Sequence, residues 1–136
     1  HGRERRQQTR HHQGDRVPGC PRDQELVGYH NAWPYLMRFA GWRMEQFLEP
    51  RPGIPPTPRQ VEFIEQHVTQ RRIAGIVQPT YAPTQTADAI AKRTGTSVIW
   101  LCQNVGERPA CSEYLAMVDY NVSQLAAATC ERPASR

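Results

Sequence analysis

Four short apolar segments alternate with segments of helical periodicity along this chain. The apolar segments cover residues 25–30, 44–50, 73–79 and 97–102, and the helical patterns cover residues 31–42, 57–72, 84–95 and 111–130. The first, third and fourth apolar segments are almost continuously apolar, which is typical of strands buried on both faces of a parallel sheet. The alternation predicts an α/β fold: a four-stranded, mostly parallel sheet with helices on both faces.

Local signals place the ends of the expected helices. Thr57 is a suitable N-cap, and Pro58 follows at the first helical position. Gly41 and Gly95 are expected to stop two other helices. In the last helix, one apolar face is expected to contain Tyr114, Leu115, Val118, Val122 and Leu125.

The ends of the chain differ in composition from its middle. Residues 1–16 contain five arginines against Glu4 and Asp15, whereas the other 120 residues are nearly neutral. We expect a disordered or non-native extension at 1–24, one α/β domain at 25–130 and a tail at 131–136. The basic end lacks interleaved aromatic residues, so no nucleic-acid partner is expected. No signal peptide is recognised, and no apolar run reaches the ~18 residues of a membrane span.

The four cysteines, Cys20, Cys102, Cys111 and Cys130, form no C-x-x-C pair. A zinc ribbon or a thioredoxin-type site is therefore not expected. Cys102 could form a disulfide with Cys111 across a loop or with Cys130, or the cysteines could be free. A disulfide would fit an exported protein.

Polar residues follow the expected strands at one edge of the sheet. His30 follows the first strand, Glu49 and Gln78 end the next two, and residues 103–113 follow the fourth. Ligands of open α/β sheets bind at this edge. His30 could bind zinc or manganese there, or act as a general base with Cys111 as nucleophile. A metal-free interaction module is the third alternative.

Four stretches resemble a known family: "VGYHNAWPYLMRFAGW", "FLEPRPGIPPTPRQVEFIEQH", "IVQPTYAPTQTADAIAKRTGTSVIWL" and the terminal "EYLAMVDYNVSQLAAA". They are similar to the carboxy-terminal lobe of the solute-binding proteins of zinc and manganese ABC transporters (cluster A-I). The resemblance runs from about residue 25 to 130. It implies a two-lobed receptor, not an enzyme, which is periplasmic or attached to the outside of the membrane and delivers its ion to the transporter permease.

The resemblance also implies a ligand set. His30 matches a metal ligand at the end of the lobe's first strand, and Ser112 falls where an aspartate ligand is expected, with Glu113 as a substitute. His30 favours Zn²⁺ over Mn²⁺, the alternative ion. The amino-terminal lobe, which supplies two further histidines, is not recognised in residues 1–24. The chain is therefore expected to be a truncated fragment.

Overall fold

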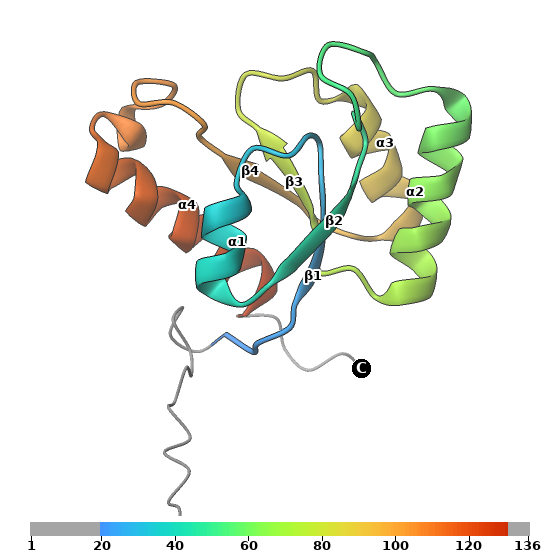
Figure 1. Cartoon of the computed structure of the whole chain (residues 1–136), viewed down its shortest axis with the longest axis horizontal. Coiled ribbons are helices and arrows are strands. Elements are labelled where there is room, and N and C mark those ends of the chain that lie inside the picture. The colour runs from blue at the N-terminus through green and yellow to red at the C-terminus, as the bar shows by residue number, and fades with distance from the viewer. Residues whose placement is uncertain (1–19, 131–136) are drawn as a thin grey trace, which may run out of the picture.

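A computed structural model describes residues 20–130, which form an open sheet between two layers of helices (Figure 1). The strands are β1 Glu25–Gly28, β2 Arg43–Phe47, β3 Ile76–Pro79 and β4 Val98–Leu101. The helices are α1 Pro34–Ala40, α2 Pro58–Arg71, α3 Gln85–Thr94 and α4 Tyr114–Thr129, with a 3-10 turn at Pro109–Cys111. The sheet order is β2-β1-β3-β4, and all three strand pairs are parallel. The expected α/β fold with a parallel sheet is confirmed.

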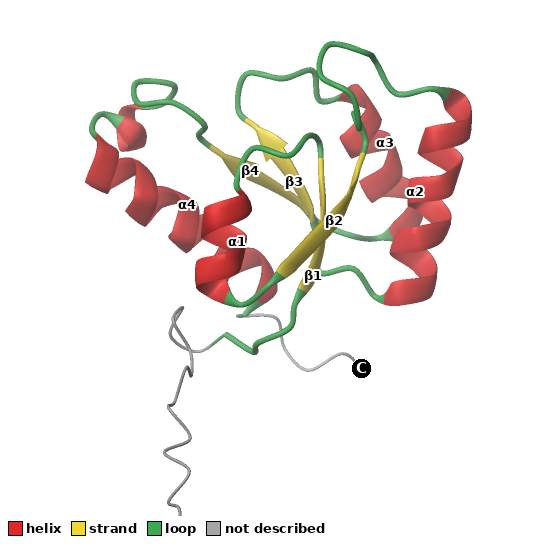
Figure 2. Ribbon diagram, in the orientation of Figure 1, coloured by secondary structure: helices red, strands yellow, loops and turns green. Residues whose placement is uncertain are grey.

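Each face of the sheet has its own core. Figure 2 shows the helix pair that covers each face. On one face, α1 and α4 bury Met37 and Leu125 against Leu26 and Leu101 of the strands. On the other face, α2 and α3 bury side chains such as Ile64. Because strand side chains alternate between faces, the central strands must be apolar at nearly every position.

The helix ends follow the local signals. The Thr57 hydroxyl accepts a hydrogen bond from the Gln60 amide at 3.2 Å. Gly41 and Gly95 end α1 and α3 with φ angles of 74° and 76°, which glycine adopts without the steric cost of a Cβ atom.

The expected apolar face of the last helix is wrong at its start. Tyr114 and Leu115 are 67% and 69% exposed, whereas Leu125 is fully buried. The 3-10 turn and the residues after it begin α4 beyond the rim of the sheet. The first turn of the helix therefore has no strand beneath it.

Two disulfides, Cys20–Cys130 and Cys102–Cys111, use all four cysteines. The second pairing is one of the sequence alternatives, whereas Cys102–Cys130 is wrong. Cys20 is 4% exposed and belongs to the core, so the folded part begins before residue 25. The remainder of the expected extension and the tail at 131–136 lie outside the described residues. Within residues 20–130, no helix is long and apolar enough to cross a membrane.

Replacing Thr57 by Ala is expected to lower the free energy of unfolding by about 1 kcal/mol, because the capping bond to Gln60 is lost. The matched control is Thr84→Ala at the start of α3, where the N-cap makes no side-chain capping bond. Urea denaturation of both variants measures the difference. Equal losses for the two threonines would contradict the assignment of the cap.

Candidate functional site

His30 lies two residues beyond β1, at the carboxyl edge of the sheet. Its Nε2 atom is 3.1 Å from the Gln103 amide oxygen and 3.4 Å from the Tyr81 hydroxyl. The Tyr81 hydroxyl also donates to the same Gln103 oxygen at 2.7 Å. Tyr81 follows β3 and Gln103 follows β4, so three loops at the upper edge of the sheet in Figure 1 meet at one nitrogen atom.

Aromatic neighbours hold the His30 ring. The Trp33 ring is nearly parallel to it, with an interplanar angle of 11° and a centroid distance of 6.4 Å. The Trp33 indole nitrogen donates to the Cys102 carbonyl at 3.4 Å, which ties α1 to the end of β4. Tyr29 meets the imidazole edge-on. These rings surround the imidazole, and Trp33 itself is 7% exposed and belongs to the core.

The loop after β4 is held by a single carboxylate. One oxygen of Glu107 accepts bonds from the Thr80 hydroxyl at 2.7 Å and from the Gln103 amide at 2.9 Å. The other oxygen accepts from the backbone and side-chain nitrogens of Asn104 at 2.9 and 2.8 Å. The Cys102–Cys111 disulfide closes the same loop. The loop that carries Gln103 is therefore anchored at its ends and across to β3.

Burial, hydrogen bonds and two carboxylates shift the pKa values of two groups at this edge. Burial would raise the pKa of Glu107, but hydrogen bonds from Thr80, Gln103 and Asn104 outweigh burial and hold that pKa below its usual value. The pKa of Tyr81 is raised by burial and by the negative charges of Glu107 and Glu49. Two carboxylates thus act on the group that contacts His30.

Asn121 anchors the same loop from below, a role that sequence reasoning missed. Its amide oxygen accepts from the Cys102 N–H and its nitrogen donates to the Cys102 carbonyl, both at 2.8 Å. The side chain is 4% exposed. The only sequence signal for this contact is the spacing of Asn121, four residues before Leu125, which places a polar residue on the core-facing side of α4.

The other residues of the predicted edge are engaged elsewhere. Gln78 is fully buried, and its nitrogen donates to the Pro83 carbonyl at 3.1 Å. Glu49 accepts from the Gly53 amide within its own loop at 2.6 Å.

Ser112 and Glu113 are exposed beyond the 3-10 turn, and no described contact joins either of them to His30. The structure instead brings Gln103 and Tyr81 to the imidazole, although neither was predicted as a ligand.

Within residues 20–130, no group of three His, Cys, Asp or Glu side chains could hold a metal ion. The His30 site therefore offers one imidazole and two neutral oxygen donors. The expected nucleophile of the enzyme alternative, Cys111, is bonded to Cys102 and has no thiolate to offer. The disulfide therefore removes Cys111 as the nucleophile partner of His30.

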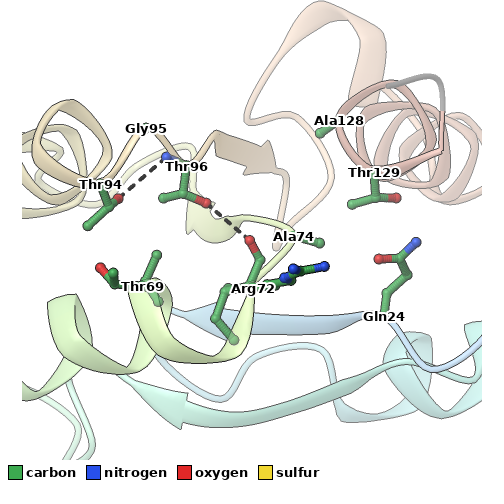
Figure 3. Close-up of a pocket in the computed structure, with 11 residues that line it drawn as sticks. Gln24, Thr69, Arg72, Ala74, Thr94, Gly95, Thr96, Ala128 and Thr129 are labelled. Carbon is green, nitrogen blue, oxygen red and sulfur yellow. Dashed lines mark hydrogen bonds between the residues drawn. The ribbon is translucent and has the colours of Figure 1, made fainter. Parts of the chain in front are cut away.

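A second hollow, of about 550 Å³, lies at the opposite edge of the sheet (Figure 3). The carboxyl ends of α2 and α3 and the end of α4 surround it, together with Arg72 and Gln24. The Thr94 and Thr129 hydroxyls donate to carbonyls four residues earlier in their helices. The polar groups here mainly complete helix ends, so we place the functional site at the His30 edge.

The fold and this edge define a class: one lobe of a solute-binding protein. The family model described as "Zinc-uptake complex component A periplasmic" matches residues 4–128, and the chain belongs to this family. The match includes most of the segment expected to be non-native. The family is one of uptake components rather than enzymes. No protein with curated annotation matches the chain.

Solved structures support the assignment. The chain is 26% identical to Lmb of Streptococcus agalactiae, described as a laminin-binding protein with adhesin and metal-transporting activity, with a TM-score of 0.65. It is also 26% identical to the laminin-binding protein Lbp of Streptococcus pyogenes, with a TM-score of 0.62. In both cases the match covers 79% of this chain and 42% of the other.

A third structure shares the fold at lower identity. FpvC of Pseudomonas aeruginosa, solved with Ni²⁺, has a TM-score of 0.72 at 20% identity, and the match covers 89% of this chain and 45% of FpvC. The chain thus spans less than half the length of these structures, as expected for one lobe.

Proposed function

We propose that this chain supplies one lobe of a receptor that binds a divalent metal ion and delivers it to an ABC importer. The observation that carries the proposal is the position of His30 Nε2, which faces the Gln103 and Tyr81 oxygens at the carboxyl edge of the sheet. His30 is the ligand of this lobe. Gln103 and Tyr81 are the nearest oxygen donors, and Ser112 or Glu113 would have to move with their loop to contribute.

The imidazole nitrogen of His30 supports Zn²⁺ as the ion, with Mn²⁺ as the alternative. Zinc prefers nitrogen and sulfur ligands, whereas manganese prefers carboxylates and other oxygens. The nitrogen atom of His30 that faces Gln103 must lose its hydrogen bond, and its proton if it carries one, before it can bind an ion. Only the neutral imidazole binds metal, so affinity is expected to fall in acid.

The surface beside the site suits contact with a second lobe in the complete receptor. A groove of about 380 Å³ runs between α1 and α4 and reaches Gln103. Tyr35 and Phe39 on α1 are 80% and 49% exposed at this surface. We assign the groove to the other lobe of the complete receptor. The receptor would act outside the cytoplasmic membrane, in contact with the permease, and without enzymatic activity.

Replacing His30 by Ala is expected to raise the zinc dissociation constant at least about 10-fold. Removing a residue that only hydrogen-bonds a metal ligand already weakens metal binding by about 10-fold or more, so removing a ligand should cost no less. Competition with a chromogenic chelator measures the constant. All variants carry Ala at His1, His11 and His12, because these imidazoles could bind zinc by themselves.

The matched control is His67→Ala at the other edge of the sheet, where His67 pairs with Glu25 at 3.2 Å. This variant is expected to bind zinc as the parent does. Equal zinc affinity in the parent, the His30 variant and the His67 variant would refute the proposed site.

A further inference from the structure

One carboxylate joins the two loops that meet at His30. The Glu107 oxygen Oε2 accepts from the Thr80 hydroxyl at 2.7 Å and from the Gln103 backbone amide at 2.9 Å. Thr80 immediately precedes Tyr81. The same oxygen atom therefore holds Gln103 directly, through its backbone, and Tyr81 through the residue before it.

The remaining bonds of Glu107 prevent the loop from turning about this point. Its Oε1 atom accepts from the Asn104 backbone and side chain at 2.9 and 2.8 Å. Four donors converge on one carboxylate, and charge-assisted bonds of this kind are about twice as strong as neutral ones. The Gln103 side chain itself is exposed, so packing alone does not fix its position.

We propose that Glu107 is a positioning residue that presets Gln103 and Tyr81 beside His30 Nε2. The inference rests on the proposed metal-binding function. Glu107 does not touch the ion; it sets the separation between the loops after β3 and β4. A carboxylate that hydrogen-bonds both loops keeps the oxygen donors in place before the ion arrives. Less conformational entropy of the loops is then lost on binding.

The test is a cycle of variants with Zn²⁺ as the probe. Glu107→Gln keeps the size of the side chain but points an NH₂ group at atoms that are themselves donors. It is expected to weaken zinc binding about 10-fold. In a background of Gln103→Ala and Tyr81→Phe, the same change is expected to cost less than about 2-fold, because the residues that Glu107 positions no longer contribute. Equal losses in the two backgrounds would overturn the inference.

One control separates the position of the Glu107 carboxylate from its charge, and a second removes a carboxylate elsewhere on the surface. Glu107→Asp keeps the charge but is too short to span both loops, so it is expected to weaken binding as Glu107→Gln does. Glu62→Gln removes an exposed carboxylate on α2 and is expected to have no effect. Parental affinity in Glu107→Asp would show that charge, not position, is what matters.

A second readout needs no metal. Nitrogen-15 NMR of the His30 imidazole in the metal-free protein reports the contact with Gln103, and Glu107→Gln is expected to shift its Nε2 resonance. If His30→Ala leaves zinc affinity unchanged, the proposed function fails, while this resonance still tests the positioning role. An unshifted resonance in a folded Glu107→Gln variant would overturn it.

Discussion

Removing the Cys20–Cys130 disulfide is expected to lower the free energy of unfolding by about 4.8 kcal/mol, because the bond closes a loop with a sequence separation of 110 residues. The bond removes much of the conformational freedom of the unfolded chain. It also fastens the segment before β1 to the end of α4, where Cys20 is buried in the core. The variant Cys20→Ala/Cys130→Ala tests this in urea denaturation under oxidising conditions.

The matched control is Cys102→Ala/Cys111→Ala, which opens a loop with a separation of only 9 residues. The same relation gives a loss of about 2.7 kcal/mol for this pair. Each double variant removes two sulfur atoms; Cys20, Cys102 and Cys111 are buried, and Cys130 is partly buried. A smaller loss for Cys20/Cys130 than for Cys102/Cys111 would contradict the loop-length explanation.

The fold could be predicted because its signals are local and periodic. Strands β1, β3 and β4 are apolar at most positions on both faces. Thr57, Gly41 and Gly95 mark helix ends by their own backbone or side-chain chemistry. Each of these residues carries its signal whatever the rest of the chain does. The sequence could not show where the sheet ends beneath α4, and the exposed Tyr114 and Leu115 were misassigned for that reason.

The site was only partly predictable. His30 was found because its place after a strand fixes its edge of the sheet. Gln103 and Tyr81 approach it through the fold of two loops, at sequence separations of 73 and 51, and no local pattern encodes such a meeting. The expected ligand positions, Ser112 and Glu113, came from counting back from the terminal motif. Both residues are exposed after the 3-10 turn that ends at Cys111, and their role as ligands stays a prediction.

The motif "YLAMVDYN", which carried part of the family resemblance, has a structural role in the described fold. Its last residue, Asn121, is buried and makes two hydrogen bonds with the backbone of Cys102. Cys102 is directly followed by Gln103. The motif therefore connects α4 to the loop that forms the candidate site, which explains why these two features occur in one lobe.

Replacing Asn121 by Ala is expected to lower the free energy of unfolding by about 3 kcal/mol, because a buried N–H and a buried carbonyl lose their partner at about 1–3 kcal/mol each. The carbonyl keeps a longer bond from the Trp33 indole at 3.4 Å, so the Cys102 N–H bears most of the loss. Chemical denaturation measures the change, and Asn31→Ala on the exposed loop after His30 is the control, with an expected loss below about 0.5 kcal/mol.

Asn121→Asp separates the two bonds. The carboxylate can still accept from the Cys102 N–H, but it has no donor for the carbonyl and places a charge in a buried position. We therefore expect it to be no more stable than Asn121→Ala. Stability equal to the parent would mean that the bond to the Cys102 N–H alone holds the end of β4. The Asn amide would then not be required as a donor, and Gln103 would keep its position without it.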